Sequence, residues 1–207
     1  MSKEFCGIKL KKGVSKRHLF ALFYVFFLST SIGGYINVQT IYLLRDPDYF
    51  NMETAVQGRV CSNVLFVAIL AGICMMPIAG YSYDMFGRKL IIFAAISIAS
   101  LLLIFTPYSS PSIVALTLLR VFIACCLATI ACHPLIMDMI KKESRGKAAA
   151  IQNLGHIFGE INAMVVLFGY SKLNGVTQKQ AFAFAAFVMG SLGTLTLYFV
   201  RNPVVMD

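Results

Sequence analysis

Hydrophobic residues occur in long runs along this chain, and short polar or proline-containing segments separate the runs. A membrane-spanning helix needs about 20 mostly apolar residues. Six segments approach or exceed that length: Leu19–Leu43, Val60–Tyr81, Leu90–Phe105, Ile113–Met137, Ala148–Phe168 and Ala181–Val200. The pattern therefore predicts an all-α membrane protein with a tail at residues 1–18, a six-helix transmembrane domain at residues 19–200 and a C-terminal tail at residues 201–207.

Composition supports a membrane location. Apolar residues make up 58% of the chain and charged residues only 13%, so a surface made from them would be poorly compatible with water. The residues that follow the basic tail form an apolar run without a small-residue cleavage site, which favours a retained first span over a secretory signal. We expect membrane lipid to surround the chain, and the sequence leaves open which membrane this is.

The 18 Lys and Arg residues are unevenly distributed between the predicted loops. One side of the membrane receives thirteen of them: Lys3, Lys9, Lys11, Lys12, Lys16, Arg17, Arg88, Lys89, Lys141, Lys142, Arg145, Lys147 and Arg201. The other side receives four: Arg45, Arg59, Lys172 and Lys179. Basic loops stay on the cytoplasmic side, or on the matrix side in an organelle, so both termini are predicted there. The net charge of +9 then reflects topology, and we expect no nucleic-acid partner.

No pattern in the chain indicates an enzyme. The six cysteines form no Cys-x-x-Cys pair, and no histidine stands near them at metal-ligand spacing. Most lie within predicted spans, where a thiol packs as a small hydrophobic group. The sequence also contains no nucleophile with an adjacent base and no phosphate-binding loop. We therefore predict no catalytic residue, no metal and no cofactor.

A polar segment between the second and third spans has a specific spacing. Gly80, Asp84, Gly87, Arg88 and Lys89 form the pattern Gly-x3-Asp-x2-Gly-Arg-Lys. Gly80 would allow a neighbouring helix to approach closely, Gly87 would allow a tight turn, and Asp84 would lie beside Arg88 at the membrane surface. The alternative is an ordinary cytoplasmic turn with topological charges. The pattern resembles the signature loop between the second and third helices of the major facilitator superfamily.

A second cluster strengthens this resemblance. Arg120 lies in the fourth span, Asp138 lies at its inner end, and Arg145 with Gly146 follows seven and eight residues later. Members of the superfamily similarly carry an arginine in the fourth helix and an acidic residue seven positions before Arg-Gly. The resemblance implies that Asp138 and Arg145 join Asp84 and Arg88 in one cytoplasmic network.

The resemblance also implies a fold and a role for the signature loop. The fold would consist of two inverted three-helix repeats, and Asp84 would face a helix N-terminus of the opposite half of a transporter. Two positions depart from the family pattern: Met85 stands where a basic residue is usual, and Lys141 stands where a proline is common. The departure at Met85 weakens the expected charge network but leaves its Asp and Arg, and the departure at Lys141 makes the match partial.

Two charged residues lie within predicted spans, where an ionisable group is costly unless it faces a cavity or a partner. Arg120 and Glu160 would differ in depth by about 5 Å, so we predict that they pair or share a water-filled cavity. The alternative is that Arg120 extends to the interface and Glu160 is protonated. His156 precedes Glu160 by one helical turn, which makes a proton-handling pair conceivable.

Uncharged polar residues provide further candidates for a substrate or proton pathway. The amides in the first span line the central cavity in the resembled family, although Gly33 and Gly34 beside them also suit a packing seam. Gly155 and Gly159 favour a helix contact over a binding site. The complete set of pathway candidates is Asn37, Gln39, Arg120, Gln152, His156 and Glu160.

The length of the chain leaves three interpretations, because a complete facilitator has two six-helix halves. Two copies, or this chain and another six-helix chain, could assemble into a transporter that works by alternating access. The chain could instead be a non-transporting structural subunit of a larger membrane complex, or a piece of a longer transporter. The retained charges favour transport, and the sequence does not identify the substrate or a driving ion.

Overall fold

A computed structural model describes residues 4–5, 7–11, 14–131, 134–173 and 175–200. The predicted C-terminal tail at residues 201–207, which includes Arg201, lies outside the described residues. Lys3, Cys6, Lys12 and Cys132 also lie outside them.

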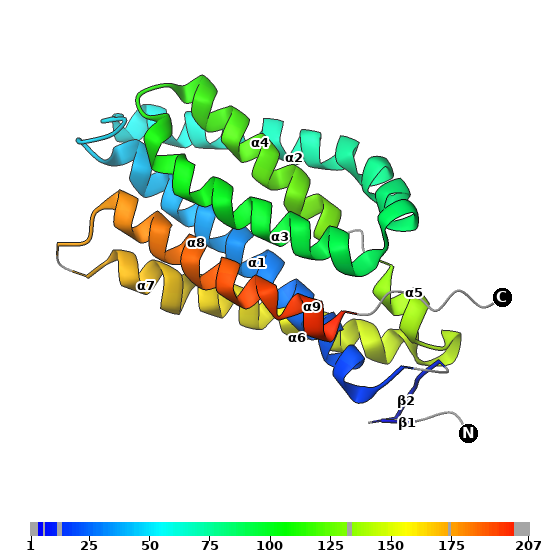
Figure 1. Cartoon of the computed structure of the whole chain (residues 1–207). Coiled ribbons are helices and arrows are strands. Elements are labelled where there is room, and N and C mark those ends of the chain that lie inside the picture. The colour runs from blue at the N-terminus through cyan, green and yellow to red at the C-terminus, as the bar shows by residue number, and fades with distance from the viewer. Residues whose placement is uncertain (1–3, 6, 12–13, 132–133, 174, 201–207) are drawn as a thin grey trace.

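The chain folds into a bundle of long helices that run side by side (Figure 1). The long helices are α1 (Lys16–Arg45), α2 (Thr54–Phe86), α3 (Arg88–Phe105), α4 (Ile113–Ala131), α6 (Arg145–Ile161) and α8 (Gln178–Thr194). Shorter elements join or extend them: η1 (Thr106–Ser109), α5 (Leu135–Met139), η2 (Lys142–Ser144), η3 (Asn162–Leu167), α7 (Phe168–Ser171) and α9 (Thr196–Phe199).

Within the described residues, five helices are long and apolar enough to cross a membrane, and they cover five of the predicted spans. The remaining predicted span, Ala148–Phe168, is built from three elements in series. Here α6 continues directly into the π-helical segment η3 and then into α7. The π-helical segment changes the hydrogen-bond register, so the span is continuous in space although it is not one uninterrupted α-helix. The predicted six-helix, all-α membrane fold is confirmed.

The packing of the helices shows the expected internal repeat. Helix α1 packs along α6, α2 packs along α4, and α3 packs against α8 and α4. The first three spans are α1, α2 and α3, and their counterparts in the last three are α4, α6 and α8. When each helix is replaced by its counterpart, the α1–α6 pair becomes the α4–α2 pair. This is the relation that two inverted three-helix repeats produce.

Glycines allow close contact at both of these helix pairs. At Gly155, a Cβ atom would overlap the main-chain carbonyl of Phe23, and at Gly159 it would lie 2.7 Å from the carbonyl oxygen of Phe27. At Gly72 in α2, it would lie 3.4 Å from the Cβ of Ala128 in α4. The prediction that Gly155 and Gly159 form a helix contact is confirmed, because only small residues let two backbones approach this closely.

The turn between α2 and α3 depends on Gly87, which has a φ of +81°. This left-handed conformation strains residues that carry a Cβ atom, so the prediction of a tight turn at Gly87 is confirmed. Gly80 makes no close helix contact among the described residues, because a Cβ atom there would meet no neighbouring helix within 4 Å; its predicted packing role stays a prediction. Gly80 lies on an exposed face of α2, whereas Gly72, two turns earlier, faces α4.

The basic N-terminal tail contains a small β-hairpin, which the sequence analysis did not predict. Strand β1 (Glu4–Phe5) pairs antiparallel with β2 (Ile8–Lys9). Leu10 then forms an isolated bridge with Ile140, after α5. The hairpin, α5 and α9 lie at the same end of the bundle (Figure 1).

Candidate functional site

Arg88 is the centre of a charge network at this end of the bundle. Its Nε donates to Asp138 Oδ2 at 2.9 Å, and its Nη1 donates to Asp84 Oδ1 at 3.1 Å and to the carbonyl oxygen of Tyr83 at 2.7 Å. The exposed fractions of the side chains are 13% for Arg88, 20% for Asp138 and 76% for Asp84. The network therefore has a shielded ion pair, Arg88–Asp138, and an exposed acidic arm, Asp84.

The structure does not bring Arg145 into this network. Arg145 begins α6, its Nε has no hydrogen-bond partner, and it belongs to none of the ion pairs in the described part of the chain. Gly146 follows it at an open position, and Lys89 follows Arg88 in the first turn of α3. The expected four-residue network is thus reduced to Asp84, Arg88 and Asp138.

The N-terminal segment forms hydrogen bonds with the residues around Asp138. Main-chain bonds run from Lys11 N to the carbonyl oxygen of Met139 at 3.0 Å and from Lys141 N to that of Lys9 at 3.1 Å. The Nζ atom of Lys11 also donates to the carbonyl oxygen of Met137, at 2.7 Å. We call residues 7–11 the N-terminal strap. The alternation Ile8-Lys9-Leu10-Lys11 is typical of a half-buried strand and could have indicated it.

An ion pair outside the membrane-spanning segments completes the strap. Lys9 Nζ lies 2.9 Å from Glu143 Oε2, and Lys9 N donates to Ser144 Oγ at 3.1 Å. The hydrogen bond and the positive charge of Lys9 lower the pKa of Glu143 below its ordinary value. Both side chains are substantially exposed. The ion pair therefore helps to position the strap but should contribute little to the stability of the fold.

Arg120 and Glu160 do not form the predicted ion pair. Arg120 Nη2 donates to Asn37 Oδ1 at 2.6 Å, and none of the ion pairs among the described residues includes either Arg120 or Glu160. The prediction assumed that spans joined by a short loop are neighbours in space. In the structure, α4 packs mainly on α2 and α3, whereas α6 packs on α1.

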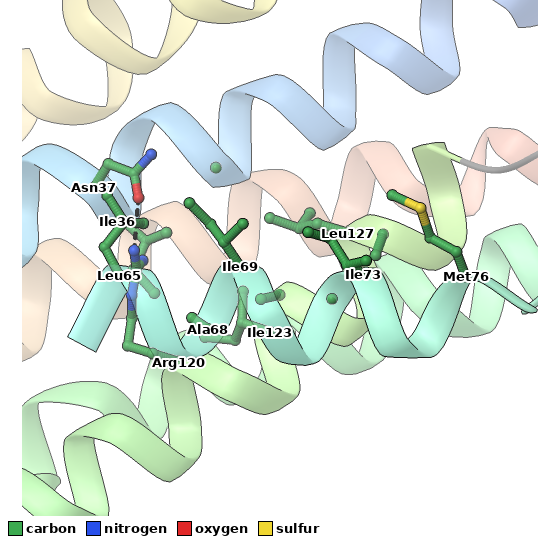
Figure 2. Close-up of a pocket in the computed structure, with 14 residues that line it drawn as sticks. Ile36, Asn37, Leu65, Ala68, Ile69, Ile73, Met76, Arg120, Ile123 and Leu127 are labelled. Atoms are coloured by element: carbon green, nitrogen blue, oxygen red, sulfur yellow. Dashed lines mark hydrogen bonds between the residues drawn. The ribbon is translucent and has the colours of Figure 1, made fainter. Parts of the chain in front are cut away.

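Arg120 instead lines a cavity of about 340 Å³ between α1, α2 and α4. Asn37 and Arg120 lie at one end of this cavity and Met76 lies at the other, with Ile69 and Ile73 between them (Figure 2). Asn37 was a predicted pathway residue, and it contacts Arg120 at this polar end. The cavity is therefore elongated, with polar groups at one end and apolar walls along its length.

The remaining predicted pathway residues on α6 form a polar stripe beside α1. His156 Nδ1 lies 2.9 Å from Thr30 Oγ1. Half-buried Glu160 packs over Gly34, so closely that a Cβ atom at Gly34 would lie 2.6 Å from Glu160 Oε2. No hydrogen bond or ion pair of Glu160 is found in the described ranges. Gln152, one turn before His156, is also half-buried.

Gln39 takes part in a buried hydrogen-bond chain between helices. It is almost completely buried, and its Nε2 donates to Gln178 Oε1 at 2.6 Å. Gln178 in turn donates to Asp46 Oδ2 at 3.1 Å. This chain joins α1, α8 and the loop after α1, and Gln39 does not line the cavity beside Arg120.

No metal-binding arrangement occurs in the part of the chain that the structure describes. No group of three or more His, Cys, Asp and Glu side chains is placed to hold an ion there. The described cysteines, Cys61, Cys74, Cys125 and Cys126, are free thiols.

Comparisons with known proteins agree with this fold. The family model "Sugar (and other) transporter" matches residues 16–204. A solved structure of the proton:xylose symporter XylE of the major facilitator superfamily, bound to 6-bromo-6-deoxy-D-glucose, is similar with a TM-score of 0.63 and 16% identity. The match covers 90% of this chain and 45% of the symporter, so the chain spans less than half of that protein. A search of curated proteins found no match.

Because the identity to the symporter is low, that structural similarity supports only the fold. The family model covers most of the sequence and therefore supports membership of the family. The chain is therefore an integral, multi-pass membrane protein that belongs to the sugar (and other) transporter family of the major facilitator superfamily.

Proposed function

We propose that this chain is one half of a transporter that moves a small solute across a membrane by alternating access. The second half would be a second copy or another six-helix chain, and the solute would pass between the halves near the middle of the bilayer. A hexose is the first substrate to test, because the family includes sugar transporters and the similar symporter was solved bound to a glucose derivative.

The main evidence for this proposal is the polar stripe on α6, formed by Gln152, His156 and Glu160. Glu160 lies well inside the span without a hydrogen-bond or ion-pair partner among the described residues, and His156 is exposed one turn away. An unpaired carboxylate in contact with hydrocarbon is strongly disfavoured. A water-filled cavity between two halves would hydrate Glu160 and His156. A helix that only packs against lipid has no need for such groups.

The exposed acidic arm supports a partner half. Asp84 projects from the shielded Arg88–Asp138 pair with most of its side chain accessible. Gly80, one turn earlier on α2, also has open space above it. A helix N-terminus of a second half could approach Gly80 closely and interact favourably with Asp84 through its dipole.

The same end of the bundle is proposed to face the cytoplasm, or the matrix in an organelle. Ten of the 18 Lys and Arg residues lie in described segments at this end of the bundle: Lys9, Lys11, Lys16, Arg17, Arg88, Lys89, Lys141, Lys142, Arg145 and Lys147. Positively charged segments resist transfer across a membrane during insertion, which favours this orientation.

A non-transporting structural subunit is the second candidate. Met85 is exposed at the position after Asp84, where the resembled pattern has a basic residue. Arg145 also lies outside the charge network. A charge network weakened in this way is compatible with a chain that no longer closes a gate.

The test combines an assembly measurement with a flux measurement. The chain is extracted gently from its native membrane, and the mass of the intact assembly is determined. A mass of two copies, or of this chain with another six-helix chain, supports a two-half transporter. A heavier single polypeptide that contains this sequence shows a piece of a longer transporter. Recovery only within a large complex supports the structural subunit.

The recovered assembly is then reconstituted into vesicles for uptake of labelled hexoses and other small solutes. We expect saturable uptake that the Glu160→Gln variant reduces at least tenfold, because the polar stripe faces the solute path. The matched control is Glu143→Gln, which changes a carboxylate outside the membrane-spanning segments and should leave uptake nearly unchanged. Equal uptake by the Glu160→Gln variant and the unmodified protein would contradict the proposed path.

A further inference from the structure

The cavity beside Arg120 has an uneven distribution of polar groups. Arg120 and Asn37 are its charged and amide-bearing residues, and they lie together at one end (Figure 2). The walls between this end and Met76 come from aliphatic side chains such as Ile69, Ile73 and Leu127. A ligand that fills the cavity therefore needs one polar end and an apolar body.

Arg120 lacks a compensating anion. Its side chain is only 6% exposed, its hydrogen bond to Asn37 involves a neutral amide, and its Nε has no partner. None of the ion pairs found in the described residues includes it. A buried cation without an anion is unfavourable, and an arginine fork is well suited to a carboxylate. The polar end of the cavity is thus complementary to a negatively charged head group.

The size of the cavity limits the rest of the ligand. Its lining on α2 runs from Leu65 to Met76, which corresponds to about 16 Å of helix. A volume of about 340 Å³ is at the small end of the range for ligand pockets. This shape fits one hydrocarbon chain and is too small for a lipid with two acyl chains.

We propose that this cavity binds an amphipathic monocarboxylate with a single hydrocarbon chain, with its carboxylate on Arg120 and its chain along Ile69 and Ile73. A free sugar fits less well, because its hydroxyl groups would lose water without gaining partners on the aliphatic walls. Binding at this cavity goes beyond the proposed transport function and does not require flux, so the two are tested separately.

The test measures binding of radiolabelled decanoate to the full chain in nanodiscs, with empty nanodiscs subtracted to correct for partition into lipid. Decanol and decylamine serve as competitors with the same chain and a different head group. We expect saturable binding that unlabelled decanoate displaces and that the other two compounds do not. Binding that decanol displaces equally well, or no saturable binding above empty nanodiscs, would overturn the proposal.

Two variants locate the site. Arg120→Gln should weaken decanoate binding about tenfold to a hundredfold, because it removes charge-assisted hydrogen bonds. Ile69→Trp keeps Arg120 but fills the cavity from its exposed rim, and it should also weaken binding at least tenfold. Ile69 is half-exposed, so this variant should fold even if Arg120→Gln does not.

The matched control is Phe187→Leu, which alters an outward-facing residue on α8 that does not line the cavity. It should bind decanoate as the unmodified chain does. Unchanged binding in Ile69→Trp, or equal losses in Ile69→Trp and Phe187→Leu, would refute the assignment. A lack of hexose uptake would count against the proposed function and would leave the decanoate result unaffected.

Discussion

The two carboxylates that contact Arg88 should contribute very differently to stability. Replacing Asp138 by Asn and Asp84 by Asn, each alone and together with Arg88→Gln, forms two double-mutant cycles that share one arginine. Each cycle isolates the coupling energy between Arg88 and one carboxylate. The geometry of the two contacts is similar, at 2.9 Å for Asp138 and 3.1 Å for Asp84, so exposure should decide the difference.

The magnitudes follow from how much water reaches each pair. Arg88 and Asp138 are 13% and 20% exposed, and a hydrogen bond between charged groups contributes about 1.5–3 kcal/mol when shielded. Their remaining exposure reduces the expected coupling to about 1–2 kcal/mol. Asp84 is 76% exposed and lies across the Gly87 turn from Arg88, so its coupling should fall in the lower part of the range for exposed pairs, about 0.2–0.5 kcal/mol.

The assay is reversible unfolding in mixed micelles, followed by circular dichroism, for the unmodified chain and all variants of both cycles. The Asp138 coupling should exceed the Asp84 coupling at least twofold. Raising the salt concentration should reduce the Asp84 coupling further, because ions screen exposed pairs more than shielded ones. An Asp84 coupling equal to or larger than the Asp138 coupling would refute the idea that Arg88 and Asp138 form the shielded part of the network.

Two further predictions concern the helix seam and the strap. Gly155→Ala should destabilise the chain by about 1–3 kcal/mol in the same unfolding assay, because its Cβ meets backbone that cannot move aside. Gly169→Ala, at an open position, should change stability by less than about 0.5 kcal/mol, and equal effects would contradict the seam. The lowered pKa of Glu143 means that its contact with Lys9 is present above the ordinary carboxyl pKa and is lost as the pH falls through the lowered value. The protection factors of the strap amides, which correct for the intrinsic pH dependence of exchange, should fall over that acidic range. An equal fall in Glu143→Gln would contradict this cause.

The sequence predicted the features that depend on local pattern. Long apolar runs give membrane-spanning helices because each span must satisfy its own backbone hydrogen bonds. The turn at Gly87 follows from the conformational freedom of glycine. The spacing of Asp84, Arg88 and Asp138, together with the resemblance to a known family, placed these residues at one end of the bundle. The structure then brings them into contact.

The sequence did not predict features that depend on which helices are neighbours. Arg120 and Glu160 have similar depths, but depth alone does not place two residues on facing helices. Within the described residues, α2 contacts α4 closely at Gly72 and not at Gly80, because the direction in which α2 faces α4 is set by packing of the whole bundle. The N-terminal strap was missed because basic residues dominate the tail and obscure the apolar positions of Ile8 and Leu10.

The most direct test of the proposed transporter half is whether water reaches the polar stripe on α6 inside the membrane. Single cysteines at His156, Glu160 and Phe187, in a background without the native cysteines, are treated in intact membranes with a small charged thiol reagent that does not enter lipid. Phe187 is the control, because it is 74% exposed on α8 and lies in the middle of an apolar span. We expect rapid labelling of the cysteines at positions 156 and 160 and no labelling at position 187. Protection of both α6 positions would contradict a water-filled cavity along this face and, with it, the proposal that the chain forms half of a transporter.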